Sequence, residues 1–327
     1  MKALVTGGGG FLGGAIVRRL LAEGHQVRSL ARGDYPELAK AGAEALKGDL
    51  GEAAAVEKAA EGMDVVFHVG AKAGVWGPYA EYHRSNVVGT ENVLAACRRR
   101  GVRKLVYTSS PSVVCGRDLE NADEATPVPE TFAAHYPATK AVAERAVLAA
   151  NGPELATVAL RPHLIWGPGD NHILPRLKAQ AERGALRKIS GRPCLVDATY
   201  IDNAVDAHLL AAERLAPGAA CAGKAYFISN GEPTELWTLV GELLKAVGAP
   251  PPTRAISPGM AHLAGAVLEA IYTVLPLKGE PRMTRFMAEE LTTHHYFDLS
   301  AARRDLGYVP HVKTKEGLLR LSLKTTD

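Results

Sequence analysis

KALVTGGGGFLGGAIVRRLLAEG, residues 2–24, is the stretch that decides the fold. It opens with an apolar run typical of a buried strand, and its second half has the apolar periodicity of a helix. The turn between them places Gly7, Gly10 and Gly13 in the spacing G-x-x-G-x-x-G. Glycines so spaced let a backbone turn sharply, approach a pyrophosphate and pack a helix closely on a sheet. The stretch therefore predicts a strand, a turn and a helix that together bind a dinucleotide.

The rest of the chain continues the alternation of strands and helices. Further strands are expected near residues 25–32, 44–50, 64–69, 103–110, 155–166 and 224–229. Strands that alternate with helices indicate a parallel sheet covered on both faces. The sequence thus predicts an α/β fold, with a doubly wound Rossmann sheet in residues 1–170 to which the chain returns at about 195–230. A smaller, interwoven α+β substrate domain is expected, mainly in residues 171–194 and 231–327.

Several connecting segments also receive an interpretation. The pattern predicts a helix at 79–100 interrupted at Gly89, a polar loop at 117–130, a helix at 172–188 and a proline-rich connector at 250–258. Asp202 is a candidate N-cap for the helix that follows it. In the tail, the expected elements are a short strand, a helix capped near Asp298 or Ser300, and a last helix.

Length, composition and charge exclude some classes of protein. The 327 residues are 47% hydrophobic, enough for about two domains, and 38 basic against 35 acidic residues give a net charge of +3. The basic residues are scattered apart from Arg98, Arg99 and Arg100, which complement the dipole at the end of a predicted helix. No stripe of positive charge is present, so nucleic acid is not an expected partner.

The cysteines and histidines give no metal or disulfide pattern. Cys97, Cys115, Cys194 and Cys221 lack ligand or disulfide spacing, which favours a reducing, cytoplasmic location. His294 and His295 lack a partner at ligand spacing, so no metal site is predicted. The first predicted strand starts at Lys2, which leaves no room for a removable signal peptide.

Arg32 and Asp49 follow the second and third predicted strands, where the adenosine end of a dinucleotide should lie. An acidic residue at the first position would bind a free ribose hydroxyl, whereas an arginine can pair with a 2′-phosphate. NADPH is therefore favoured over NADH, although Arg28 on the same strand is also basic and a solvated surface charge is an alternative for Arg32. Asp49 could accept a hydrogen bond from adenine or cap the helix that starts near Glu52.

HYPATKAVAE, residues 135–144, places Tyr136 and Lys140 one helical turn apart. Residues with this spacing lie on the same face, so the ammonium is expected to lower the pKa of the phenol. Such a phenol can exchange a proton with a carbonyl oxygen or an alcohol. Ser110 ends a predicted strand before Pro111, at the carboxyl edge where parallel sheets bind ligands. It could donate a hydrogen bond to a substrate carbonyl, or simply finish a strand.

The segment 260–277, MAHLAGAVLEAIYTVLPL, is largely apolar but contains Glu269. A charge near the middle of a membrane helix is costly, so a membrane span is not expected. An interfacial helix is an alternative. We expect instead a helix that lines an apolar substrate cleft or covers the core.

Ordered motifs extend over the whole chain. They are TGGGGFLG at 6–13, GDL at 48–50, NVVGTENV at 86–93, YTSS at 107–110, YPATK at 136–140 and RP at 161–162. With them the chain resembles the extended short-chain dehydrogenase/reductases, specifically the 3β-hydroxysteroid dehydrogenase-like branch. The stretches AKAGVWGPY, TYIDNA, GKAYFISNGEP and ARRDLGYVP look most similar to the bacterial 2-alkyl-3-oxoalkanoate reductases of long-chain olefin biosynthesis.

The resemblance implies roles for individual residues. Ser110, Tyr136 and Lys140 would form the catalytic triad, in which the tyrosine protonates the substrate oxygen. The implied cofactor-binding residues are Gly7, Gly10, Phe11, Leu12, Gly13, Arg32, Asp49, Leu50, Tyr136, Lys140, Pro162 and His163. Asn86 would steady the loop around the cofactor phosphates, while His68 is expected to be a packed core histidine.

The same resemblance implies an NAD(P)-dependent oxidoreductase. It would use NADPH to reduce the 3-keto group of a long-chain 2-alkyl-3-oxoalkanoic acid to the 3-hydroxy acid. A homodimer through helices at 87–98 and 139–150, and association with other enzymes of olefin biosynthesis, are also implied. The alternatives are a 3β-hydroxysteroid dehydrogenase, a nucleotide-sugar epimerase or dehydratase, and a dinucleotide-sensing regulator. The apolar final third argues against a sugar nucleotide, and the retained Tyr136 and Lys140 argue against a regulator.

Two departures from the family pattern lie near the site. The chain has His68-Val69-Gly70-Ala71 where many relatives have H-x-A-A, and Pro111 follows Ser110 directly. Neither change removes a reacting group. For the substrate carboxylate, the basic candidates are Lys72, Arg176 and Arg187, with a surface charge as the alternative for each.

Overall fold

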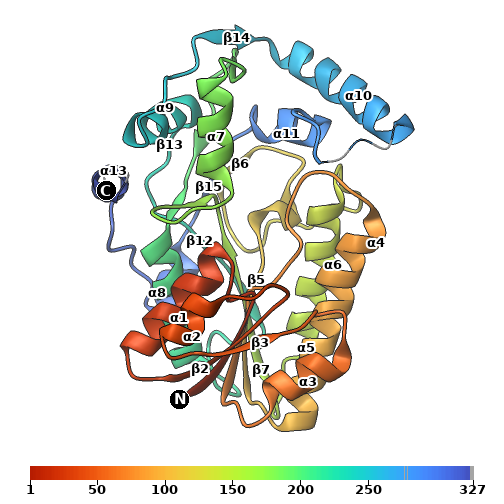
Figure 1. Cartoon of the computed structure of the whole chain (residues 1–327), viewed down its shortest axis with the longest axis vertical. Helices are drawn as coiled ribbons and strands as arrows, with labels where there is room; N and C mark the ends of the chain where they lie inside the picture. Colours follow the sequence, from red (N-terminus) through yellow and green to blue (C-terminus); the bar gives the residue numbers. More distant parts are fainter. Residues whose placement is uncertain (276, 278, 325–327) are drawn as a thin grey trace.

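A seven-stranded parallel sheet forms the centre of the protein, whose computed structural model describes residues 1–275, 277 and 279–324 (Figure 1). The strand order is β12-β7-β5-β4-β1-β2-β3. The strands are β1 (Lys2–Thr6), β2 (Gln26–Ala31), β3 (Glu44–Lys47), β4 (Val65–His68), β5 (Lys104–Thr108), β7 (Ala156–Pro162) and β12 (Lys224–Ile228). The predicted doubly wound α/β fold is therefore confirmed.

Helices cover both faces of this sheet (Figure 1). One face carries α1 (Phe11–Ala22) and α8 (Ile201–Arg214), which contact each other. The other carries α3 (Ala53–Ala60), α5 (Gly89–Arg100) and α6 (His135–Ala149), packed in that order. Because both faces are covered, strands such as β1 and β4 are almost continuously apolar, as parallel strands should be. The short α2 (Pro36–Lys40) follows β2.

A second group of elements lies beyond the carboxyl ends of the central strands, in the upper half of Figure 1. Its main sheet has the order β13-β10-β15-β6 and consists of β6 (Leu119–Ala122), β10 (Leu195–Val196), β13 (Thr234–Glu235) and β15 (His295–Phe297). Around it lie α7 (Ile173–Glu182), α9 (Leu236–Ala246), α10 (Pro258–Val274) and α11 (Arg285–Glu290). The chain ends with α12 (Ser300–Leu306) and α13 (Thr314–Lys324).

Three short strands lie where the sequence predicted a loop, a helix and a connector. The predicted polar loop at 117–130 contains β6, which pairs with β15. The predicted helix at 172–188 ends at Glu182, before the left-handed Gly184 (φ +59°), and its last residues enter β9 (Arg187–Ile189). β9 pairs with β14 (Arg254–Ile256), inside the segment interpreted as a proline-rich connector. The remaining two-stranded sheet joins β8 (Ile165–Trp166) to β11 (Thr199–Tyr200).

Two local predictions about helices were wrong. Gly89 does not interrupt the helix at 79–100, because its backbone is helical; the irregular part is a π-helical turn, His83–Val88, between α4 (Tyr79–Tyr82) and α5. The N-cap of α8 is Tyr200, and Asp202 lies in the first turn, where its carboxylate accepts a hydrogen bond from Arg320 at 3.0 Å.

In the tail, Asp298 accepts a hydrogen bond from the Ser300 amide at 2.8 Å, although the N-cap of α12 is Leu299.

α10 is apolar but lies on the outside of the molecule. Leu263, Val267, Ile271 and Val274 follow one another at helical spacing and are 66%, 49%, 39% and 79% exposed. Glu269 instead turns inward and accepts hydrogen bonds from the backbone and side chain of Arg285, each at 2.7 Å. Pro276, within the apolar segment named from the sequence, lies outside the described residues. Among the described residues, no helix combines the length and the apolar character that a membrane span requires.

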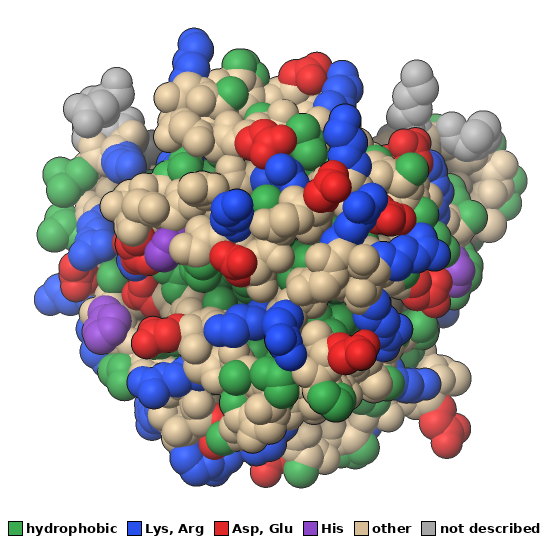
Figure 2. Space-filling model, turned by 90° about the horizontal axis from the view of Figure 1, so that it is seen from below, with side chains coloured by type: hydrophobic (Ala, Val, Ile, Leu, Met, Phe, Trp, Pro, Cys, Tyr) green, Lys and Arg blue, Asp and Glu red, His purple; other side chains and the backbone are tan. Residues whose placement is uncertain are grey.

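Charge is mixed on the face of the molecule seen from below in Figure 2. Basic and acidic side chains alternate over this face, and neither sign forms a continuous patch. Charged side chains of the described residues often pair, as in the link from Arg100 to Glu57 at 3.2 Å. The scattered charges of the sequence thus stay scattered on this face after folding.

Candidate active site

A cleft of about 850 Å³ opens at the carboxyl ends of the central strands. Every residue that received a catalytic or cofactor-binding role from the sequence lines this cleft. These are Gly7, Gly10, Phe11, Leu12, Gly13, Arg32, Asp49, Leu50, Ser110, Tyr136, Lys140, Pro162 and His163. Residues more than 150 positions apart in the chain therefore meet in one cavity, at the sheet edge where open α/β folds bind ligands.

The glycine turn forms one end of the cleft. Gly7 has a left-handed backbone (φ +70°) and its carbonyl accepts a hydrogen bond from the Gly10 amide at 2.9 Å. A Cβ added to Gly13 would lie 2.2 Å from the Gly7 carbonyl oxygen, so only glycine lets α1 start this close to the turn. The backbone of the turn and the free amides at the start of α1 face the cavity, which suits a diphosphate.

Arg32 and Tyr35 line the part of the cleft where the adenosine of a dinucleotide is expected. Arg28, the other basic residue of β2, is already engaged: it donates to Glu44 at 2.7 Å and to the Ala59 carbonyl at 2.8 Å. Tyr35 was missed by sequence reasoning. Its ring covers the glycine turn so closely that a Cβ on Gly9 would lie 2.1 Å from ring carbons. The only signal in the sequence was an aromatic residue three positions after Arg32.

Asp49 lies just beyond β3 and does not cap α3, whose N-cap is Glu52. Its Oδ1 accepts a hydrogen bond from the Gly51 amide at 2.7 Å, and its Oδ2 is 3.7 Å from the guanidinium of Arg84. The carboxylate thus closes the turn after β3 while it also borders the cleft. Of the two alternatives, the helix cap is wrong and the cofactor contact stays a prediction.

Ser110, Tyr136 and Lys140 form the opposite wall. Ser110 lies two residues beyond the end of β5, and its Oγ accepts a hydrogen bond from the Ser112 hydroxyl at 2.9 Å. Pro111 starts a short 3₁₀ turn that directs the chain away from the sheet. Tyr136 and Lys140 share the inner face of α6, and Lys140 Nζ donates to the Thr108 carbonyl at 2.6 Å. The tyrosine, the serine and the lysine therefore converge at the end of β5.

Burial changes the proton affinities of this group. The pKa of Tyr136 is raised by burial of its phenol, and a hydrogen bond with Ser110 acts in the opposite direction. Burial also lowers the pKa of Lys140 to about 7, against the opposing effect of Glu144. The expected lowering of the Tyr136 pKa was therefore wrong in direction, because helical spacing does not account for burial. A lysine with a pKa near neutrality is instead poised to gain or lose a proton itself.

A buried ion pair lies one helical turn beyond Lys140. Glu144, one turn further along α6, accepts two hydrogen bonds from Arg161 of β7, at 2.6 and 2.9 Å. Both side chains are about 95% buried, with relative exposures of 5% for Arg161 and 4% for Glu144. The ammonium of Lys140 also lies 4.1 Å from the centroid of the Tyr107 ring, a cation–π distance. The ammonium of Lys140 is thus held next to the end of β5 and the ring of Tyr107.

Polar side chains hold the loop that follows β4. Asn86 accepts a hydrogen bond from the Lys72 amide at 2.7 Å and donates to the Lys72 carbonyl and to Thr139, each at 3.0 Å. His68 is a packed core histidine: it is buried, lies within hydrogen-bond distance of Thr6 and Thr90, and has its pKa lowered to about 3 by burial. Asn86 is thus a structural support for a wall of the cleft.

The three basic candidates for a substrate carboxylate are not equivalent. Lys72 and Arg176 line the cleft, but each has an acidic partner: Lys72 lies 2.8 Å from Glu81, and Arg176 lies 2.5 Å from Glu280. Arg187 does not line the cleft. Its guanidinium donates to the Gly184 carbonyl at 2.6 Å, so the prediction that it meets the substrate carboxylate was wrong.

Sequence reasoning also missed part of the cleft lining. This part consists of Cys115, Leu119, Phe286, Glu290 and His295, the last three from elements near the C-terminus. None of the described residues of α10 lines the cleft, so the expectation that this helix faces the substrate was wrong for the part described. The apolar lining comes from α11 and from the loops after β4 and β5 instead.

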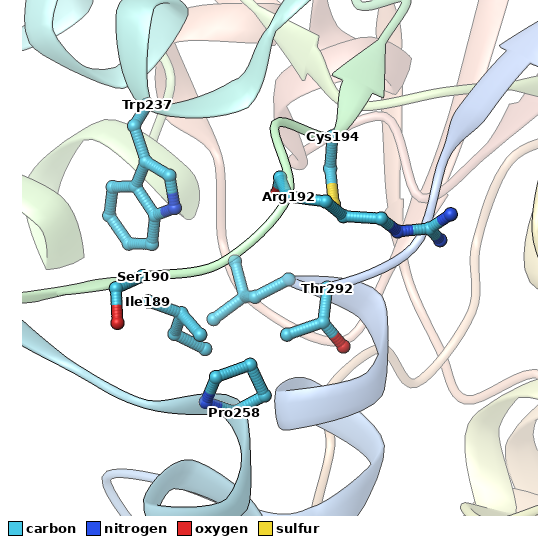
Figure 3. A pocket seen from close by; sticks show the side chains of 8 residues that line it. Ile189, Ser190, Arg192, Cys194, Trp237, Pro258 and Thr292 are labelled. Atoms are coloured by element: carbon cyan, nitrogen blue, oxygen red, sulfur yellow. The ribbon is translucent and has the colours of Figure 1, made fainter.

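A smaller cavity of about 190 Å³ lies beside the end of α11 (Figure 3). Trp237, Pro258 and Thr292 surround it, while the side chain of Arg192 extends away from it. No residue predicted for the site lines this cavity. Among the described residues, no group of three His, Cys, Asp or Glu could hold a metal ion, and the four cysteines are buried and unpaired.

Together, the glycine cradle and the Ser-Tyr-Lys wall define a class of protein: a nicotinamide dinucleotide-dependent oxidoreductase on a Rossmann fold. Comparison with known families agrees, because residues 4–257 match the model of the 3-beta hydroxysteroid dehydrogenase/isomerase family. The chain belongs to this family of extended short-chain dehydrogenases/reductases. It is accordingly an NAD(P)-dependent enzyme acting on an alcohol or a carbonyl group.

Comparison with individual proteins gives more specific similarities. The chain is 56% identical over 325 residues to a 2-alkyl-3-oxoalkanoate reductase of Stenotrophomonas maltophilia, covering 98% of each chain. It is 47% identical to the enzyme of the same name from Shewanella oneidensis, covering 98% of this chain and 85% of the relative. Among solved structures, MoeE5 in complex with UDP-glucose and NAD is 25% identical, with a TM-score of 0.75 over 100% of this chain and 98% of MoeE5.

Proposed function

We propose that the protein uses NADPH to reduce the 3-keto group of a long-chain 2-alkyl-3-oxoalkanoic acid to the 2-alkyl-3-hydroxyalkanoic acid. The observation that carries the proposal is the convergence of Ser110, Tyr136 and Lys140 in the cleft that begins at the glycine turn. High identity over nearly the full length to two 2-alkyl-3-oxoalkanoate reductases supports this substrate class.

Each residue of the wall has a task that follows from its position. When bound, the dinucleotide supplies a hydride. Ser110 donates a hydrogen bond to the substrate carbonyl, and the Tyr136 phenol transfers its proton to the oxygen as negative charge develops there. Lys140 holds its ammonium against the Thr108 carbonyl and the Tyr107 ring, where a positive charge stabilises the phenolate that remains.

NADPH is proposed over NADH because of Arg32. Arg32 lines the cleft, whereas the guanidinium of Arg28 already donates hydrogen bonds to Glu44 and to backbone carbonyls. The neighbouring acid Asp34 pairs with Lys47 at 2.9 Å, so it is already neutralised. An Arg32→Glu variant should therefore lose most of its preference for NADPH, measured as the ratio of kcat/KM for the two cofactors. An unchanged ratio would show that Arg32 does not select NADPH over NADH.

Tyr136→Phe tests the reaction itself. The variant keeps the ring but lacks the proton that the product oxygen needs, so keto-acid reduction should fall by about 10²-fold or more. Activity within a few-fold of the wild type would contradict the mechanism. Parallel assays with a 2-alkyl-3-oxo acid, a 3-keto steroid and a UDP-sugar test the substrate class, and preference for the steroid would favour the hydroxysteroid dehydrogenase alternative given by the family.

Assembly and location are part of the same proposal. We infer a homodimer through α5 and α6, where Val142 is an apolar residue that is 44% exposed. A cytoplasmic location is proposed from the four unpaired cysteines, and association with other enzymes of olefin biosynthesis from the similarity to the 2-alkyl-3-oxoalkanoate reductases. Light scattering of the purified protein tests the dimer, and a single monomeric mass would reject it.

A further inference from the structure

Leu164 is an apolar residue held in an unusual backbone conformation inside the cleft. It lies in the short connection between β7 and β8, and it lines the same cavity as Ser110 and Tyr136. Its φ angle is +41°, in the left-handed region that glycine and asparagine adopt more readily than leucine. The residue is 37% exposed, whereas His163 just before it is 8% exposed. The catalytic and cofactor-binding roles described above leave this side chain unassigned.

Hydrogen bonds on both sides fix this conformation. The His163 amide donates to the Ile228 carbonyl at 3.1 Å, and the His163 carbonyl accepts a hydrogen bond from the Thr199 hydroxyl at 2.7 Å. The Thr199 amide donates to the Leu164 carbonyl at 3.3 Å, next to the pairing of β8 with β11. A strained backbone persists only where its surroundings determine it in this way, and such positions cluster at functional sites. The fold therefore sets the direction in which the side chain at 164 leaves the backbone.

Leu164 borders the reacting part of the cleft. The ends of β5 and β7 lie side by side, since Thr108 stands opposite Leu160 and the Ser109 amide donates to the Leu160 carbonyl at 2.6 Å. Ser110 lies two residues beyond the end of β5, and Leu164 lies two residues beyond the end of β7. Two residues span at most about 7 Å. A molecule whose carbonyl group binds at Ser110 therefore lies within reach of the leucine.

Apolar side chains from the next part of the chain line the same cavity. Ile165 belongs to β8, and Ile173 starts α7. Asp170 also lines the cavity, but its carboxylate already accepts hydrogen bonds from the amides of His172, Ile173 and Leu174, at 2.7, 3.1 and 2.9 Å. This part of the lining thus offers apolar contacts to a ligand, and its acidic group is engaged by the backbone.

We propose that Leu164 is a specificity-determining residue, whose side chain packs against the alkyl chains of the substrate where they leave the reacting carbon. The inference rests on the proposed function, since it assigns contacts of that same 2-alkyl-3-oxoalkanoic acid. In such an acid the keto carbon carries one chain directly and the other through the neighbouring carbon, so both chains begin within two bonds of the atom that is reduced. A leucine near Ser110 meets their first methylene groups, and removing these apolar groups from water favours binding.

Leucine is an unfavourable choice at this position for the free protein. Glycine or asparagine would adopt the left-handed conformation with less strain, and neither would expose a large apolar side chain to water. A bound alkyl chain covers the exposed surface of the leucine. The substrate thus supplies an apolar partner that the folded chain alone does not give to this exposed surface.

The test compares two hydroxy acids in the oxidative direction with NADP⁺. One is a 2-alkyl-3-hydroxyalkanoic acid with two long chains, and the other is the same acid with both chains shortened to methyl groups. The readout is the ratio of kcat/KM for the long acid to kcat/KM for the short acid, in which effects on the cofactor and on Tyr136 cancel.

Leu164→Asn keeps the branched shape of the side chain but makes it polar. It should lower the ratio about tenfold or more, the usual effect of a small change in an apolar pocket. Leu164→Met is the matched control: it keeps an unbranched Cβ and an apolar side chain, so its ratio should stay within about threefold of the wild type. An equal loss with both acids would place the leucine against the cofactor or the reacting groups, and would overturn the assignment.

Urea unfolding provides a second readout, for which a purely structural role predicts the opposite sign. Leu164→Asn relieves backbone strain, so its unfolding midpoint should equal or exceed that of the wild type. A lower midpoint together with an unchanged ratio would show that the leucine serves only the fold, and would reject the inference. If the wild type oxidised neither acid, the proposed function would fail and the inference with it. A wild type that oxidises both acids, with a ratio that Leu164→Asn does not change, rejects the inference alone.

Discussion

Replacing Glu144 by glutamine perturbs both the stability of the protein and the chemistry of Lys140. The carboxylate of Glu144 accepts two hydrogen bonds from Arg161, and both partners are almost fully buried. It also raises the pKa of Lys140 against the effect of burial. One substitution therefore removes the counter-charge of an arginine and a charge that keeps the lysine protonated.

The size of the effect follows from the burial. Removing one partner of a buried ion pair leaves the other charge uncompensated and costs about 3–5 kcal/mol. The guanidinium of Arg161 can still stack on Phe227, whose ring centroid is 5.1 Å away, so the lower end of this range is expected. Without Glu144 the pKa of Lys140 falls below its value of about 7, and fewer molecules carry the ammonium at neutral pH. If the ammonium is needed, the alkaline limb of the kcat profile moves to lower pH.

Urea unfolding at pH 7 and the pH dependence of kcat measure the two effects. The double variant Glu144→Leu, Arg161→Met serves as the control, because it removes both charges and should recover much of the stability. It should not recover the pH profile, since Lys140 still lacks its acidic neighbour. The reasoning would be refuted by a Glu144→Gln protein that unfolds within about 1 kcal/mol of the wild type and has an unshifted profile.

Two further changes give clear expectations. Gly13→Ala should abolish dinucleotide binding in a fluorescence titration, because the new methyl group would lie 2.2 Å from the Gly7 carbonyl oxygen; a dissociation constant within threefold of the wild type would contradict this. Stability should fall as the pH drops below 6.5, because burial lowers the folded pKa of His68 to about 3 and of His208 to about 4. The unfolded chain then binds more protons, at up to about 1.4 kcal/mol per pH unit for each histidine. A urea midpoint that stays constant from pH 7 to pH 5 would be evidence against it.

Predictions from the sequence succeeded where the signal is local. The strand, glycine turn and helix at the N-terminus are contiguous, and the spacing of Tyr136 and Lys140 is set by one helix. β6, β9 and β14 were missed because each has only three or four residues and pairs with a strand distant in sequence. Such strands form through tertiary pairing, which overrides weak local preference.

The same distinction applies to the cleft. Ser110 could be located because Pro111 follows it shortly after a strand, whereas Glu290 and His295 have no motif around them and reach the cleft only through the packing of α11 and β15. The direction of the Tyr136 pKa shift was wrong for a related reason. Burial is a property of the whole fold, and no spacing along α6 reports it.

The sheet β13-β10-β15-β6 has a consequence for protein engineering. Its four strands come from residues 119–122, 195–196, 234–235 and 295–297, and the chain returns to the central sheet, in β7 and then in β12, between the first three of them. No single cut therefore releases the substrate-facing part as a cassette. Specificity in this scaffold is more easily altered by point changes in the cleft than by exchanging a contiguous block between homologues.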